Sequence, residues 1–115
     1  MNYDDMSNLM DRVIIPQIKQ TRASGQAEYA RTEQDVLANF KRIGNSLNLP
    51  VEKVISVYLM KHFDGVLSYA EGHKSQREDV TGRLTDIIVY CCLLWASIED
   101  NRNNLTIKEN NSENN

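Results

Sequence analysis

The sequence predicts an all-α fold built from four main helices. Glycine and proline are scarce, with five and two among 115 residues, and no segment keeps the period-two alternation of a half-buried strand. Apolar residues instead recur at spacings of three and four, as on amphipathic helices. The run Ile87–Ala96 is apolar or amphipathic throughout. Such a helix is buried at the centre of a helical cluster or between subunits.

The first helix is expected from about Ser7 to Thr21. Pro16 removes an internal hydrogen bond and predicts a kink or a break there. The segment Arg22–Gln26 contains serine and glycine and is interpreted as a loop. It leads into the short stretch Ala27–Arg31.

The second helix is expected to begin at Thr32, a favourable N-cap residue. Asp35 would then lie in the first turn, where the helix dipole favours a carboxylate. Four apolar residues form one stripe along this helix, which is expected to end towards Asn48: Val36, Leu37, Phe40 and Ile43.

The third and fourth helices are predicted to form an antiparallel hairpin. Pro50 suits the first turn of the third helix, which should extend to about Ala70 or Glu71 and stop at Gly72. The segment Ser75–Glu78 has capping-box spacing and would start a helix that continues to about Asp100. Residues 1–100 thus form one domain. The asparagine-rich tail, 101–115, is expected to be disordered.

Composition restricts the partners and the compartment. The net charge is -3 and no basic block is present, so nucleic acid is not an expected partner. The ten-residue apolar run is shorter than the roughly 20 residues of a membrane span, which predicts a cytoplasmic protein without a membrane partner. Cys91 and Cys92 diverge on a helix and are interpreted as core residues in a reducing compartment. An apolar fourth helix predicts a homodimer or a higher oligomer.

Polar residues interrupt the apolar faces of three helices. Lys61 and Asp64 lie on the third helix, Arg83 and Asp86 on the fourth, and Asn39 on the second. One interpretation is ordinary i,i+3 ion pairs on solvated faces. Another is convergence on a phosphate-bearing ligand, with the two cations at phosphate and the two carboxylates at Mg²⁺ or ribose hydroxyls. A protein-binding surface is the third.

No catalytic residue can be assigned from these patterns. The sequence contains no glycine-rich phosphate loop and no nucleophile–base pair. His62 is more typical of a half-buried hydrogen-bonding residue than of a catalytic base, and His73 is expected to be solvated. Whether the chain is an enzyme is therefore left open.

Several short motifs occur together in a recognisable order. They are Gly25–Arg31 (GQAEYAR), Asp35, Asn39–Lys41 (NFK), Lys61-His62 and Asp86–Tyr90 (DIIVY). This order resembles small phage and prophage proteins with the pattern K-G-x-E-Y-A, N-F-K, K-H and D-x-x-x-Y, associated with the nucleotide-modification-associated family. The resemblance covers about residues 17–100. Gly25 and Gln26 depart from the first motif.

The resemblance implies a set of ligand-binding residues. Its matched positions add Glu28, Tyr29, Lys41 and His62 to the convergent residues Asn39, Lys61, Arg83 and Asp86. The phage proteins in turn resemble MazG-type all-α nucleoside triphosphate pyrophosphohydrolases, whose E-x-x-E and E-x-x-D motifs hold Mg²⁺ around a triphosphate. Here Arg83 replaces one glutamate, and Lys61 stands where an acidic residue is expected. Asp64 and Asp86 remain as the candidate Mg²⁺ ligands.

Two functions are therefore expected, with a true pyrophosphohydrolase as a third option. The first is a phage or prophage accessory protein in the host cytoplasm that binds nucleotides or their derivatives, as a degenerate MazG-like pyrophosphohydrolase. The alternative is a non-enzymatic phage protein that binds and inhibits a host enzyme or defence component.

Overall fold

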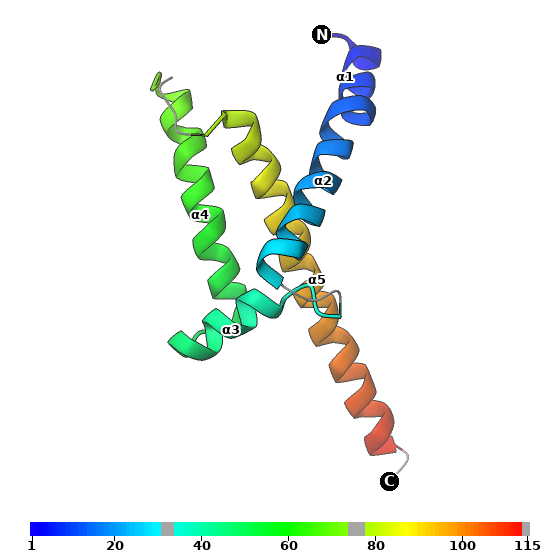
Figure 1. Ribbon diagram of the computed structural model, residues 1–115. Coiled ribbons are helices and arrows are strands. Elements are labelled where there is room, and N and C mark those ends of the chain that lie inside the picture. Colours follow the sequence, from blue (N-terminus) through cyan, green and yellow to red (C-terminus); the bar gives the residue numbers. More distant parts are fainter. Residues whose placement is uncertain (31–33, 74–77, 114–115) are drawn as a thin grey trace.

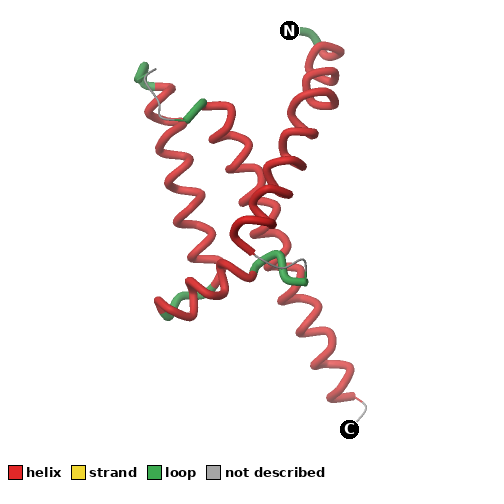
Figure 2. The backbone as a smooth tube through the Cα atoms, in the orientation of Figure 1, coloured by secondary structure: helices red, strands yellow, loops and turns green. Residues whose placement is uncertain are grey.

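The computed structural model describes residues 1–30, 34–73 and 78–113, and every regular element within them is a helix (Figure 2). The predicted all-α class is confirmed. A long N-terminal helical segment crosses the hairpin of α4 and α5, and the short α3 lies at the base of α4 (Figure 1). The molecule measures 59 × 37 × 25 Å.

The N-terminal segment is helical without a break from Tyr3 to Ala30. It comprises α1 (Tyr3–Leu9), the π-helical turn η1 (Met10–Ile14), α2 (Ile15–Gly25) and a second π-helical turn, η2 (Gln26–Ala30). The predicted loop Arg22–Gln26 is therefore wrong, and of the kink or break predicted at Pro16 the break is wrong. Pro16 lies in the first turn of α2, directly after η1, where the changed hydrogen-bond pattern accommodates its missing N–H. Packing of α2 against α5 offsets the helix cost of Gly25, about 1 kcal/mol.

The helix α3 (Ala38–Leu47) begins later than predicted. Asp35 lies in the preceding turn, where its Oδ1 accepts the N–H of Leu37 at 3.0 Å and its Oδ2 accepts Lys41 Nζ at 2.7 Å. The predicted N-cap Thr32 lies outside the described residues. The helix ends as predicted, at Asn48, whose φ of 56° is left-handed.

The predicted antiparallel hairpin is present as α4 (Val51–Ala70) and α5 (Val80–Glu113) (Figure 1). Pro50 is the N-cap of α4. Gly72 follows the end of α4, and its φ of 102° takes the backbone out of the helical conformation. The expected capping residue Ser75 lies outside the described residues. The predicted helix end near Asp100 is wrong: the backbone stays helical through the asparagine-rich segment, since nothing there breaks the hydrogen-bond ladder.

The hydrophobic core lies where α3, α4 and α5 meet. Its buried apolar residues are Leu37, Phe40, Val54, Ile55 and Val89. The apolar run of α5 contributes only part of its surface to this core, because Trp95 is 68% exposed. Cys91 and Cys92 are also exposed, so their interpretation as core residues is wrong.

The stretch Val80–Leu105 of α5 is long and apolar enough to cross a membrane, judged by length and composition alone. The apolar stretch of this helix is thus longer than the ten-residue run on which the sequence prediction was based. Only 17% of its most apolar window is buried, although α5 packs against both α4 and α2. The cytoplasmic location remains a prediction.

Candidate functional site

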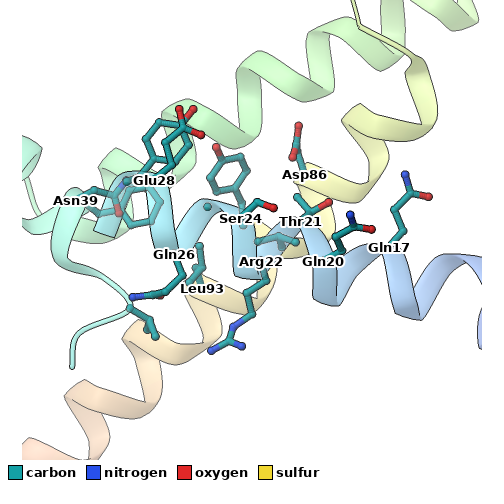
Figure 3. A pocket seen from close by; sticks show the side chains of 16 residues that line it. Gln17, Gln20, Thr21, Arg22, Ser24, Gln26, Glu28, Asn39, Asp86 and Leu93 are labelled. Carbon is teal, nitrogen blue, oxygen red and sulfur yellow. The ribbon is translucent and has the colours of Figure 1, made fainter. Parts of the chain in front are cut away.

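A cavity of about 430 Å³ lies between the N-terminal helical segment and α5, closed at one end by α3 (Figure 3). Two helical stripes form its long walls. The residues of α2 on one wall are Gln17, Gln20, Thr21 and Ser24, and those of α5 on the other are Asp86, Val89, Tyr90 and Leu93. Both sets follow i, i+3, i+4, i+7 spacing, which places each set on one face of its helix.

The four-residue stripe of α2 is composed of amides and hydroxyls, and Arg22 beside it adds a cation to the lining. The amides and hydroxyls donate and accept hydrogen bonds without carrying charge, and Figure 3 shows Gln20, Thr21 and Ser24 along the α2 side of the cavity. The sequence interpretation missed this stripe because it ended the helix at Thr21. A helix continued to Gly25 would have aligned all four polar residues.

The closed end of the cavity brings together η2 and α3. Glu28 and Tyr29 come from η2, while Asn39 and Phe40 come from α3. The guanidinium of Arg42 donates to the carbonyl of Tyr29 at 2.5 Å. This bond ties the two elements to each other and fixes the position of the closed end.

The α5 wall includes Tyr90, which lies at the centre of an aromatic cluster. Its ring stacks on Tyr58 and on His62, with centroids 5.6 Å away in each case, and meets the edge of Phe40 at 6.1 Å. Burial, followed by the nearby Asp86 carboxylate, raises the pKa of Tyr90 to about 12. The phenol therefore stays protonated and available as a donor at neutral pH.

Asp86 is the half-buried carboxylate of the α5 wall. Burial raises its pKa above the ordinary value, against the opposing charges of His62, Arg83 and Lys61. Its Oδ2 lies 3.7 Å from Nδ1 of the buried His62. Glu78 adds a third ligand-type side chain at this point: one atom from each of the three residues lies within 4.8 Å of the others.

Four of the predicted site residues line the cavity: Glu28, Tyr29, Asn39 and Asp86. His62 lies behind this wall, against Tyr90 and Asp86. The structure thus brings together residues that are as many as 58 positions apart in the sequence. Glu28 and Tyr29, which entered only through the family resemblance, are among them.

The remaining predicted residues do not line the cavity. Lys41 is paired with Asp35, and the side chain of Arg83 passes directly over Gly65 of α4. Lys61 and Asp64 are exposed.

Asp64 and Asp86, the two predicted Mg²⁺ ligands, are not brought together in the cavity, which Asp86 lines and Asp64 does not. Asp64 follows the inward-facing His62 by two positions, and side chains two apart on a helix diverge by about 200°. Asp64 is exposed on α4, and the described residues that gather around Asp86 as metal-ligand types are His62 and Glu78. The helical spacing predicted for α4 and α5 was correct, but the sequence did not show which face of α4 packs against α5.

Comparison with known proteins adds no relative. No family model matches the chain, and no match is found among curated proteins or solved structures.

Proposed function

We propose that the chain binds a nucleotide or a nucleotide derivative in the cavity between α2 and α5. The observation that carries this proposal is the lining itself. The volume of the cavity, about 430 Å³, is within the range of small-molecule sites, roughly 300–1,000 Å³. The amides of α2 and Asn39 offer the paired donors and acceptors that match a base edge. Phe40 and Tyr90 supply aromatic surface, and Glu28 supplies an acceptor for ribose hydroxyls.

The charges in the cavity bear on how phosphates would be held. Among the described residues that line the cavity Arg22 is the single cation, whereas Glu28 and Asp86 are acidic. A polyphosphate would therefore enter with its own Mg²⁺, which is bound in proteins through one or two carboxylates and substrate phosphates. Asp86 is the carboxylate on the α5 wall that suits this role.

The residue pattern supports the same class of ligand. The phage family that the chain resembles is associated with nucleotide modification, and the matched Glu28, Tyr29 and Asp86 line the cavity. Lys61 and Arg83 take the places of acidic residues in MazG-type enzymes, so the four-carboxylate metal cage is missing. These substitutions favour binding over hydrolysis, in keeping with a phage accessory protein derived from such an enzyme.

Calorimetric titration with ribo- and deoxyribonucleoside triphosphates, with and without Mg²⁺, tests the proposal. We expect saturable heat for at least one nucleotide, reduced at least about tenfold in affinity by Asn39→Ala or Glu28→Gln, since each leaves a polar ligand group unpaired. Asp64→Asn is the matched control, because Asp64 is exposed on α4. Absence of heat for every nucleotide with folded protein would contradict the proposal.

A second candidate is an interaction protein, and the exposed apolar side chains favour it. Trp95, Met60 and Val57 are each more than 60% exposed. The radius of gyration is 17.6 Å, compared with about 13 Å for a compact domain of this length. The uncovered surface fits a second copy of the chain or a host protein. A pull-down from host lysate distinguishes the two, since a host partner adds a protein of another mass.

A further inference from the structure

We infer that the α4–α5 hairpin binds one divalent transition-metal ion, of the Zn²⁺ or Mn²⁺ class, through His62, Glu78 and Asp86. One ligand atom from each residue lies within 4.8 Å of the other two. His62 comes from α4, Asp86 from α5, and Glu78 from the segment just before α5. The ion would link the two helices of the hairpin.

The state of His62 is the independent observation that points to a ligand. The residue is only 6% exposed, and its Nδ1 is buried without a hydrogen-bond partner among the described residues. Buried polar atoms are nearly always paired. This nitrogen faces Asp86 Oδ2 at 3.7 Å, which is too long for a hydrogen bond.

The same distance suits two ligands of one ion. Metal–nitrogen and metal–oxygen bonds to Zn²⁺ are about 2.0–2.2 Å long, so two ligand atoms on one ion are separated by roughly 3–4 Å. An ion between Nδ1 and Oδ2 would give the orphan nitrogen a partner and neutralise a half-buried carboxylate. Glu78 is exposed, so rotation of its side chain can bring its oxygen into the coordination sphere.

The imidazole is held in place by its neighbours before any ion arrives. The His62 ring stacks on Tyr90 with an interplanar angle of 29°, and Tyr90 stacks in turn on Tyr58 at 25°. This stack fixes the plane of the imidazole, with its Nδ1 facing the Asp86 carboxylate. Such fixed orientation of a histidine ligand is what neighbouring groups provide in known metal sites.

The donor set selects the type of ion. One imidazole with two carboxylates suits Zn²⁺, Mn²⁺ and related ions, whereas Mg²⁺ prefers oxygen ligands alone. The inferred ion is therefore a different element from the Mg²⁺ that would accompany a phosphate in the cavity, although Asp86 is a candidate ligand of both. Excess Mg²⁺ is expected not to displace it.

The experiment is a titration of chelator-treated, nucleotide-free full-length protein with Zn²⁺ and Mn²⁺, followed by calorimetry. We expect one ion per chain for at least one of the two metals, and at least about tenfold weaker binding in His62→Gln, Glu78→Gln and Asp86→Asn. His73→Gln, which changes the other histidine of the chain, is the matched control and should bind as the wild type does. Circular dichroism shows whether each variant is folded.

Three results would overturn the inference. They are no uptake of either ion by folded protein, unchanged affinity in folded Glu78→Gln and Asp86→Asn, or loss of binding in Cys91→Ser or Cys92→Ser. Co²⁺ absorption separates the last case, because thiolate ligands give charge-transfer bands and a His–carboxylate site does not. If His62→Gln fails to fold, the affinity measured for Glu78→Gln, a variant at an exposed position, decides the question. The titration contains no nucleotide, so its outcome is independent of the proposed cavity ligand.

Discussion

Ser97 on α5 donates a hydrogen bond of 2.8 Å to Oε1 of Glu52 on α4, across 45 residues of sequence. The side-chain amide of Asn101 donates to the same oxygen at 3.0 Å. Ser97 is 4% exposed, so its hydroxyl has little access to water. This pair connects the beginning of α4 to the middle of α5, where the hairpin has no turn to hold it together.

Ser97→Ala is expected to destabilise the protein by about 1.5–3 kcal/mol, the usual contribution of a hydrogen bond to a charged group. Urea denaturation measures this change. Ser46→Ala serves as the control, because the exposed Ser46 hydroxyl donates only to the carbonyl of Arg42 in its own helix. We expect the control to change stability by less than about 0.5 kcal/mol.

The Ser97 effect should depend on pH in a defined direction. The hydrogen bond from Ser97 is the largest cause lowering the pKa of Glu52 below its usual 4.5. A lowered folded-state pKa stabilises the protein above the unfolded value and loses this contribution as pH falls through the folded value. The difference between wild type and Ser97→Ala should therefore shrink below pH 4.5. A constant difference would contradict the assigned cause.

Asp86→Asn is expected to stabilise the metal-free protein at pH 7. Burial raises the pKa of Asp86 above 3.8, so the folded chain binds this proton more tightly than the unfolded chain. The ionised carboxylate opposes folding above the folded-state pKa, and the cost disappears as pH falls below the unfolded value. The gain should thus be present at pH 7 and vanish near pH 3. Asp64→Asn, an exposed position on α4, is the matched control at pH 7 in chelator and should change stability by less than about 0.5 kcal/mol.

Gly44→Ala is expected to destabilise the end of α3. A Cβ at this position would lie 2.6 Å from the carbonyl oxygen of Leu49. That backbone cannot move freely, because the N–H of Leu49 donates to the carbonyl of Gly44 at 2.9 Å. We expect a loss of about 1–3 kcal/mol, typical of overpacking.

The matched control for Gly44 lies in α5. A Cβ at Gly82 would meet nothing within 4 Å, so Gly82→Ala should stabilise the protein by about 0.5–1 kcal/mol through helix propensity. Thermal denaturation of the two variants should thus give shifts of opposite sign. Equal shifts would show that the contact with Leu49 does not constrain the α3 end.

The elements with strong local signals were predicted closely. Pro50 and Gly72 bracket a continuous helical pattern, and α4 ends within one residue of the prediction. The hairpin follows because only a short connection separates two long helices. The first half of the chain was predicted less well, since Pro16 and Gly25 are helix breakers by propensity. Tertiary packing against α5 and the π-helical turns overrode that preference.

The candidate site was predictable only in part for a related reason. Helical spacing placed Asp86 and Asn39 on inward faces, and both line the cavity. It could not decide that Asp64 lies on the outer face of α4, because that depends on which stripe of α4 packs against α5. The polar stripe that α2 contributes to the cavity was missed because the predicted helix ended too early. Interhelical rotation, rather than residue type, was the missing information.

The exposed apolar stripe of α5 leads to the last prediction, that the chain forms a homodimer or a higher oligomer. Leu84, Ile88 and Trp95 lie on one face of α5 and are 37–68% exposed. Burying such side chains against a second copy would contribute about 25 cal/mol for each Å² of apolar surface removed from water.

Light scattering at micromolar concentration should give a multiple of 13.2 kDa. Trp95→Lys should shift the protein towards the monomer without unfolding it, because the new cation lies one turn from Glu99. Tyr3→Lys, at an exposed position at the start of α1, should leave the assembly unchanged. A wild-type protein found only at 13.2 kDa would show that this stripe is not covered by a second copy.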